Sequence, residues 1–308
     1  MRVAIVGAGT FAKFFAEELP KAGHEVVILT RSHKQFFEGK PGVLEQRLTD
    51  YSSVPQLVEL LSDCEALVST IMDFTKAYAD IHLALIEACK QTPKCKRFIP
   101  SEYGGNSEDH PEEEGSAYQY NQVVKKALQA QTELEWSVIS LGWLMDYLVP
   151  STNRYHGDLG PLFALDLNTK TMTIPGTGHE VFTMTSARDT ARAVGELLRS
   201  KNKWRPYTYV QGEETTWLQL AELMKTVGGM PDLKVEFESV EELEAIVAKK
   251  ESFETMFVAE FKLYVPDGFN KFDQTKVQRD RAEFFPTVHF RTVKEALLAV
   301  QNDPTMVL

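Results

Sequence analysis

The chain begins with a short apolar segment, a glycine turn and the start of a helix. Residues 3–6, Val-Ala-Ile-Val, form the continuous apolar run that is typical of a parallel strand buried on both faces. Gly7 permits the sharp turn, Gly9 allows the backbone to approach a diphosphate, and Ala12 is small enough for the helix to pack on the strand. The free N–H groups of the first helical turn favour an anion. This arrangement predicts a dinucleotide-binding unit, and the alternative is a plain strand–turn–helix.

The end of the second predicted strand, residues 25–29, indicates which dinucleotide such a unit binds. NAD-selective sites place an Asp or Glu at this tip, where it accepts hydrogen bonds from the ribose 2′-hydroxyl. Here no acidic residue follows the strand before Glu38, and Arg31 stands at the tip with Ser32 and Lys34 close behind. A guanidinium suits a 2′-phosphate through paired, charge-assisted hydrogen bonds. The sequence therefore favours NADP(H), unless Arg31 is an ordinary solvated arginine.

Strands and helices alternate through the first half of the chain. Apolar runs predict strands at 42–47, 65–71, 96–100 and 136–140, and helical spacing of apolar residues predicts helices near 76–91 and 117–131. This alternation predicts an α/β fold, a Rossmann-type doubly wound parallel sheet, with its ligands at the carboxyl ends of the strands. The residues that fall at such ends are Thr70, Ile71, Ser101, Glu102, Tyr103 and Gly142.

Turn residues become frequent in the second half of the chain. The segment 175–178 lies between two short β-type runs and predicts a hairpin, rather than a second phosphate-binding loop. Ser186 and Asp189 have capping-box spacing ahead of a helix. Residues 204–211 predict a strand that returns to the sheet.

These patterns predict two parts joined around a cleft. We expect an NADP-binding Rossmann domain at residues 1–150, to which about 180–212 returns. We expect a smaller mixed α/β substrate-binding lobe at 151–308.

Composition limits the partners and the compartment. The formal net charge of −11 argues against nucleic acid or an anionic membrane as the main partner. No apolar run is long enough to span a bilayer, and the amino terminus is already the first strand. Cys64, Cys89 and Cys95 show no metal-binding spacing and indicate reduced thiols in a cytoplasmic protein. A small-molecule substrate is the expected partner, and both a monomer and a homodimer remain open.

Longer motifs extend over nearly the whole chain. The most specific is Arg-Phe-Ile-Pro-Ser-Glu-Tyr-Gly at 97–104, and the others lie at 7–12, 29–31, 123–127, 142–144 and 188–194. They resemble the NmrA-like and isoflavone-reductase-like branch of the atypical short-chain dehydrogenases, in particular its fungal members. The resemblance implies an NADPH-binding fold that commonly reduces phenolic or unsaturated secondary metabolites. It also implies nucleotide contacts from Gly7, Gly9, Thr10, Phe11 and Arg31, with Thr70 and the turn at 100–103 lining the nicotinamide.

The chain departs from this family at one position. Isoflavone-type reductases carry a lysine, assigned to proton transfer, one helical turn before a Val-Val-basic-basic-Ala segment, and the matching residue here is Asn121. Asparagine hydrogen-bonds but does not supply a proton at neutral pH. Lys125 lies four residues on, on the same helix face, where the fold places a lysine near the nicotinamide ribose, and the alternative is a solvated helix lysine. Tyr103 is a further candidate proton donor, unless it is a packed aromatic residue.

Four other residues are candidates for contact with a substrate. Tyr118 begins the helix before Lys125, Trp143 and Asp146 follow the sixth predicted strand, and His156 lies in the next loop. Each has a structural alternative, which is a core position for the aromatic residues and an exposed position for the histidine. The acidic segment 108–114 is expected to be a solvated loop, and we expect no metal.

The sequence as a whole predicts an NADPH-dependent oxidoreductase of small-molecule, secondary metabolism. The asparagine at the lysine position leaves open a redox-neutral cyclase, isomerase or dehydratase on the same fold. A non-catalytic NADP(H) sensor that binds a protein partner is the third class.

Overall fold

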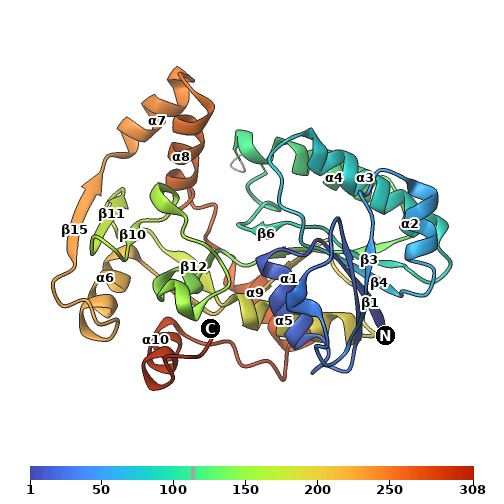
Figure 1. Ribbon diagram of the computed structural model, residues 1–308. Coiled ribbons are helices and arrows are strands. Elements are labelled where there is room, and N and C mark those ends of the chain that lie inside the picture. Colours follow the sequence, from blue (N-terminus) through green and yellow to red (C-terminus); the bar gives the residue numbers. More distant parts are fainter. Residues whose placement is uncertain (112–114) are drawn as a thin grey trace.

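A parallel sheet in the first half of the chain positions the glycine turn. The computed structural model describes residues 1–111 and 115–308, and in them this sheet has six strands (Figure 1). Their order is β3 (Val43–Leu48), β2 (Glu25–Thr30), β1 (Arg2–Val6), β4 (Ala66–Ser69), β5 (Arg97–Ile99) and β7 (Glu135–Trp136). The connection reverses direction between β1 and β4, so the ligand crevice of such a sheet opens at the carboxyl ends of these two strands. The predicted Rossmann-type α/β fold is confirmed.

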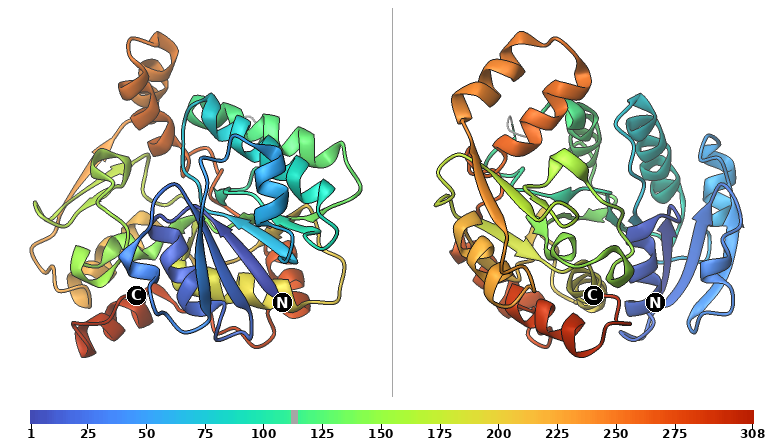
Figure 2. Two further views of the ribbon diagram at one scale, coloured as in Figure 1. Left: turned by 45° about the vertical axis from the view of Figure 1, so that its right-hand side comes forward. Right: turned by 60° about the vertical axis from the view of Figure 1, so that its left-hand side comes forward.

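Helices cover both faces of this sheet because its central strands are apolar on both sides. The covering helices are α1 (Thr10–Glu18) and α5 (Ala187–Arg199) on one face, and α2 (Val54–Leu60), α3 (Lys76–Gln91) and α4 (Gln119–Gln129) on the other (Figures 1 and 2). Val3 and Ile5 of β1 belong to the core with α1 and α5, whereas Ala4 and Val6 belong to the opposite core. Alternate residues of one strand thus enter two separate cores.

A short parallel sheet extends this arrangement. Its order is β13 (Tyr207–Tyr209), β8 (Val138–Ser140) and β6 (Tyr103–Gly104). The segment 204–211 therefore returns to the first half of the chain, as the sequence predicts. Helix α9 (Gln274–Phe284) packs there too, with Val277 in one buried cluster with Tyr209. We still propose the division near residue 150, with α9 added to the nucleotide-binding part.

The remaining elements surround a second apolar core. Among the described residues its strands form two small sheets, β14 (Glu213–Thr215), β12 (Phe182–Thr185) and β9 (Trp143–Leu144), and β10 (Leu165–Asp166), β11 (Thr171–Pro175) and β15 (Lys234–Glu238). Its helices are α6 (Trp217–Thr226), α7 (Val240–Lys249), α8 (Phe253–Leu263) and α10 (Val293–Asn302). Trp143, Met184 and Trp217 lie in this core, which we call the second lobe.

The predicted hairpin around residues 175–178 is wrong. β11 pairs with β10 and β15, whereas β12 pairs with β14 and β9, so the two consecutive strands lie in different sheets. The turn between them contains Gly176 and Gly178, with φ of 81° and 79°. These left-handed positions, which favour glycine, turn the chain from one sheet to the other.

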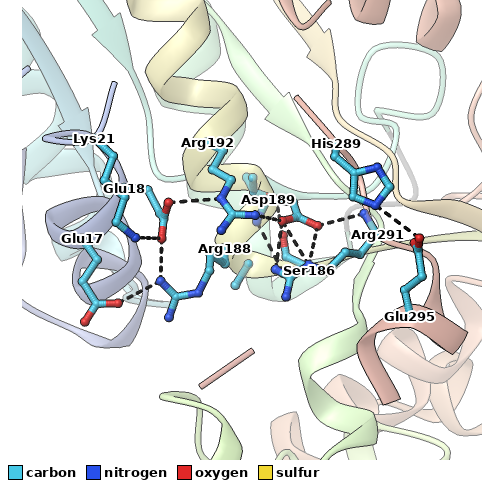
Figure 3. A network of polar contacts seen from close by, with 12 residues as sticks. Glu17, Glu18, Lys21, Ser186, Arg188, Asp189, Arg192, His289, Arg291 and Glu295 are labelled. Carbon is cyan, nitrogen blue, oxygen red and sulfur yellow. Dashed lines mark hydrogen bonds and ion pairs between the residues drawn. The ribbon is translucent and has the colours of Figure 1, made fainter. Parts of the chain in front are cut away.

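A network of buried ion pairs joins α1 to α5 and to the segment before α10 (Figure 3). The Arg188 guanidinium of α5 lies 2.6 Å from the Glu18 carboxylate of α1. The Asp189 carboxylate accepts hydrogen bonds from the Arg291 side chain at 2.9 Å and from its backbone N–H at 3.0 Å. The Glu18 and Asp189 side chains are only 2% and 1% exposed, so these partners compensate for their desolvation.

The final residues of the sequence close onto both lobes. The Leu308 N–H donates to the Asn153 carbonyl oxygen at 2.8 Å, and the Asn153 side-chain amide donates to the Pro304 and Met306 carbonyl oxygens. Arg188 donates to the Val307 carbonyl oxygen at 3.1 Å. We call these contacts the C-terminal clasp.

Two further findings bear on the sequence predictions. In the described part of the chain, no helix has both the length and the apolar character needed to cross a bilayer. Cys64, Cys89 and Cys95 are buried free thiols, with the Cys89 and Cys95 sulfur atoms 3.6 Å apart.

Candidate active site

The glycine turn between β1 and α1 is shaped for a diphosphate. Gly7 has φ of 97°, and a Cβ atom there would lie 2.9 Å from Thr70 Oγ1, so the position is closed to larger residues. Gly9 precedes the first residue of α1 and provides no side-chain cap, and a Cβ atom there would meet nothing within 4 Å. Ala12 is fully buried where α1 packs on the sheet. The start of α1 thus has no side-chain cap and has open space beside Gly9, which fits a phosphate group.

Arg31 lies at the end of β2 and is exposed, as a residue that binds a 2′-phosphate must be. Its guanidinium carbon is 5.6 Å from the centre of the Tyr51 ring, which places a flat aromatic surface beneath the charge. Ser32 and Lys34 follow and are also exposed. The Lys34 backbone is held by the Gln46 side chain through hydrogen bonds of 2.8 and 3.0 Å, so this short segment has a defined course.

Thr70 and Tyr103 tie the end of β4 to its neighbours. Thr70 Oγ1 donates to the Val6 carbonyl oxygen at 3.2 Å, and Ile71 follows and is half-buried. The Tyr103 hydroxyl donates to the Ser69 carbonyl oxygen at 2.9 Å, and its ring lies 4.5 Å from that of Phe11. Burial raises the pKa of Tyr103 well above its usual value. Tyr103 is thus a packed aromatic residue whose proton is already donated, a poor position for a catalytic acid.

Asn121 and Lys125 lie on the buried face of α4, one turn apart. They are 7% and 2% exposed, so the alternative of a solvated Lys125 is wrong. Lys125 Nζ lies 3.5 Å from the carboxylate of Glu102, which is itself buried at the end of the 97–104 motif. An ion pair out of water is held together strongly, since each charge would otherwise be buried alone. Glu102 therefore positions Lys125.

Helix α3 holds the turn after β5, a role that the sequence analysis missed. The Tyr78 hydroxyl donates to the Ser101 carbonyl oxygen at 3.2 Å, and the Ser101 N–H lies 3.4 Å from His82 Nε2. His82 Nδ1 donates to the Tyr78 carbonyl oxygen at 2.8 Å, so Nε2 is the acceptor. Burial lowers the pKa of His82 to about 4. The available signal was a tyrosine and a histidine four residues apart on the apolar face of a helix.

Aromatic side chains connect α4 to the second lobe. Tyr118 lies just before α4, with ring centres 5.6 Å from Phe74 and 5.8 Å from Phe261 of α8. Phe261 also lies 6.2 Å from Trp143, which is 7% exposed. Tyr118 and Trp143 are therefore brought to one wall, with Phe261 between them.

Asp146 does not line the substrate region, contrary to the sequence prediction. Its side chain is fully buried, and its carboxylate accepts a hydrogen bond of 2.9 Å from the Ala187 N–H at the start of α5. Burial raises the pKa of Asp146 to about 6, and the hydrogen bond only partly opposes this. Asp146 acts as a buried carboxylate at a helix start.

His156, a candidate for contact with a substrate, lies beside the glycine turn. Its Nδ1 atom is 3.1 Å from Thr10 Oγ1, and its ring stacks on Phe14 at 5.5 Å. Burial lowers the pKa of His156 to about 4. The second-lobe loop that carries His156 therefore supports the first turn of α1.

The acidic segment 108–114 is described only up to residue 111, and residues 112–114 lie outside the described part. Within it, Lys276 of α9 contacts the carboxylates of Glu108 at 2.8 Å and Asp109 at 2.7 Å. Among the described residues no group of three or more His, Cys, Asp or Glu side chains is placed to hold a metal ion.

The sheet order and the glycine turn define a Rossmann-type α/β protein with a second lobe. The sequence model of the NmrA-like family matches residues 1–297, and the chain belongs to that family. The predicted resemblance is confirmed.

Individual proteins are similar to this chain over nearly its whole length. Oxidoreductase swnR of Arthroderma benhamiae is 38% identical over 309 residues, which cover 100% of both chains. A solved structure of AtPrR2 with NADP+ and (+)pinoresinol superposes with a TM-score of 0.77 at 18% identity, covering 96% of this chain and 97% of the other. A ternary complex of leucoanthocyanidin reductase from Vitis vinifera gives 0.72 at 18% identity, covering 97% and 99%. At these identities the solved structures establish the shared fold.

Proposed function

We propose that the protein is an NADPH-dependent reductase that transfers hydride to a small, phenolic or unsaturated secondary metabolite. The observation that carries the proposal is the uncapped start of α1 facing open space at Gly9, with exposed Arg31 at the neighbouring strand end. The relative swnR is named an oxidoreductase, and the structural neighbour AtPrR2 holds NADP+ together with (+)pinoresinol. These likenesses support an oxidoreductase role.

Three groups of residues would hold different parts of such a dinucleotide. Gly7, Gly9, Thr10, Phe11 and Ala12 would hold the diphosphate at the start of α1. Arg31, Ser32 and Lys34 would hold the 2′-phosphate. The residues that would border the nicotinamide are Thr70, Ile71, Ser101 and Glu102. Glu102 would act there through its ion pair with Lys125. When bound, NADPH supplies the hydride.

Asn121 and Lys125 are the residues suited to the substrate's developing negative charge. The Asn121 amide donates a hydrogen bond but keeps its protons, whereas the Lys125 ammonium donates both a hydrogen bond and a proton. Since Glu102 fixes Lys125, the ammonium is already oriented before a substrate arrives. We therefore assign proton delivery to Lys125 and oxyanion orientation to Asn121.

Calorimetry with NADPH and NADH tests the cofactor assignment. We expect Arg31→Ala to weaken NADPH binding by about 10- to 100-fold, because it removes a charge-assisted contact to the extra phosphate, and to leave NADH binding unchanged. The matched control is Arg199→Ala, another exposed arginine, on α5, which should leave both affinities unchanged. Absence of heat with either dinucleotide in the unaltered protein would refute the proposal.

Turnover is tested by incubating the purified protein with NADPH and a panel of enones and quinone-like phenolics. Loss of the dihydronicotinamide absorbance together with a product heavier by two hydrogens supports reduction. The asparagine at the family's lysine position supports a second candidate, a redox-neutral cyclase, isomerase or dehydratase. That candidate predicts products without added hydrogen and no consumption of NADPH.

A further inference from the structure

Tyr51, which follows β3, has a backbone conformation that aromatic residues rarely adopt. Its φ is 69°, in the left-handed region, where a bulky side chain costs free energy. The other non-glycine residues with positive φ in the described part of the chain are Lys170 and Lys250, and both are exposed, whereas Tyr51 is only 3% exposed. Strained residues that the surrounding structure holds in place cluster at functional sites. The sequence analysis did not single out Tyr51.

Hydrogen bonds hold this conformation against β2 and the glycine turn. The Tyr51 N–H donates to Thr49 Oγ1 at 3.0 Å, and the Thr49 N–H donates to the Thr30 carbonyl oxygen at 3.0 Å. The Tyr51 hydroxyl donates to the Leu29 carbonyl oxygen at 3.0 Å, which also accepts the Gly7 N–H at 2.9 Å. One carbonyl oxygen of β2 thus joins Tyr51 to the glycine turn.

The Tyr51 ring supports the charge of Arg31. The guanidinium carbon lies over the ring, 5.6 Å from its centre, and Arg31 itself is exposed. An aromatic face attracts a cation without supplying a countercharge, so the guanidinium keeps its full charge for a ligand. The contact also restricts a long side chain that would otherwise sample many conformations in water. Because Tyr51 is buried, its ring has almost no surface with which to touch a nucleotide.

We propose that Tyr51 is a positioning residue that determines the preference for a 2′-phosphate over a 2′-hydroxyl by holding the Arg31 guanidinium in place. This inference rests on the proposed function, in which Arg31 contacts that phosphate. A guanidinium that is already oriented loses less entropy when a phosphate binds, and only a nucleotide that carries the phosphate gains from this. The left-handed backbone turns the ring from the end of β3 back to the tip of β2, where Arg31 lies.

Calorimetry with NADPH and NADH on variants of Tyr51 tests the proposal. We expect Tyr51→Leu to weaken NADPH binding by about fivefold, because the cation loses its aromatic contact, and to leave NADH binding unchanged. Tyr51→Phe removes the hydroxyl but keeps the ring, and it should keep the preference for NADPH. Phe290→Leu is the matched control and should change neither affinity, because it removes a ring that lies 4.9 Å from the guanidinium carbon of exposed Arg281. Equal losses for both nucleotides in Tyr51→Leu, or no loss, would overturn the proposal.

A double variant shows whether Tyr51 acts through Arg31. In an Arg31→Ala protein, Tyr51→Leu should weaken NADPH binding no further, because the group that Tyr51 holds is gone. The same loss in both backgrounds would contradict the positioning role.

Nuclear magnetic resonance of the unaltered protein without a nucleotide decides the matter even if Tyr51→Leu does not fold. The Arg31 Nε–H signal, assigned by its loss in Arg31→Ala, should be shifted upfield by the ring current of Tyr51, and an unshifted signal would overturn the proposal. Absence of NADPH binding by the unaltered protein would refute the proposed function and this inference together. Binding of NADPH that is insensitive to Tyr51 would refute this inference alone.

Discussion

His82 shows how one buried side chain fixes the turn after β5. It donates to the Tyr78 carbonyl oxygen and accepts from the Ser101 N–H, which requires the neutral imidazole with its proton on Nδ1. Protonation would place a second N–H opposite that of Ser101 and a charge in an apolar layer. The turn after β5 therefore depends on His82 remaining neutral.

We predict that this dependence makes the fold sensitive to acid. Burial lowers the folded-state pKa of His82 to about 4, below the unfolded value of 6.5. The unfolded state thus binds the proton first, and up to about 3 kcal/mol of stability is lost as the pH falls from 6.5 to 4. His82→Gln should flatten the pH dependence measured by urea unfolding at pH 7 and pH 5, whereas His179→Gln, at an exposed position, should not. An unchanged slope in His82→Gln would contradict this assignment.

Asp146 makes stability depend on pH in the opposite direction from His82. Burial raises its folded-state pKa to about 6 from 3.8, so the native state binds the proton first and stability falls as the pH rises from 4 to 6. Asp146→Asn keeps an oxygen for the Ala187 N–H and carries no charge. We expect the variant to gain up to about 3 kcal/mol at pH 7 relative to the native protein, measured by urea unfolding. Asp232→Asn, an exposed change, is the control, and a loss of stability in Asp146→Asn would contradict the prediction.

At the scale of elements, α5 is held by charges on both sides. Arg188 pairs with Glu18 of α1, and Asp189 pairs with Arg291 in the segment before α10 (Figure 3). Asp189 has the most buried carboxylate in this group at 1% exposure, and it also accepts the Arg291 N–H. Its charge therefore determines the register between α5 and that segment.

We predict that Asp189→Asn destabilises the protein by about 3 kcal/mol, because it leaves the Arg291 guanidinium buried without its anion. Urea unfolding at neutral pH measures the change. Glu196→Gln is the matched control on the same helix: its partner Arg199 is 58% exposed, so the loss should stay below about 0.5 kcal/mol. Similar losses in both variants would show that burial of the pair does not matter.

Most helices and strands were predictable from the sequence, because the residue patterns that indicate them act on neighbouring residues. The apolar runs of β1 and β2, the small residues at Gly7, Gly9 and Ala12, and the N-capping Ser186 each act on neighbouring residues. The predicted hairpin was wrong because the pairing of strands is not a local property. Alternating residues indicate a strand but not its partner, and β11 and β12 find their partners in β15 and β9, far away in the sequence.

The candidate site was predictable only where the sheet determines it. Thr70, Ser101 and Arg31 follow strands, and the ends of parallel strands gather at one edge of the sheet. Asp146 and His156 lie in the connection to the second lobe, where the packing of α5 and α1 determines their contacts. No local pattern encodes that packing, and the roles of all these residues remain predictions.

At the scale of the whole molecule, one of the contacts that join the lobes is a polar contact of α8. The Ser116 N–H and hydroxyl both donate to the Glu260 carboxylate, at 3.0 and 2.9 Å. Helix α8 also carries Phe261, the wall between Tyr118 and Trp143. Glu260 thus holds this wall against the segment that precedes α4.

We predict that Glu260→Ala loosens α8 without affecting α1, because α1 makes none of these contacts. Hydrogen exchange measured by mass spectrometry should become faster in residues 253–263 and remain unchanged in residues 10–18. Glu260→Gln, which keeps one acceptor oxygen, should give an intermediate effect. Unchanged exchange in α8 would show that its apolar contacts alone hold it.

The C-terminal clasp links the glycine turn to residues 304–308. The Asn153 carbonyl oxygen accepts a hydrogen bond from the Leu308 N–H, and Asn153 lies only three residues before His156. The His156 side chain in turn contacts Thr10 at the start of α1. During synthesis the sheet emerges first and can begin to fold. The loop of His156 gains its anchor only after Leu308 has left the ribosome, so a nascent chain has its parallel sheet before it has a fully supported glycine turn.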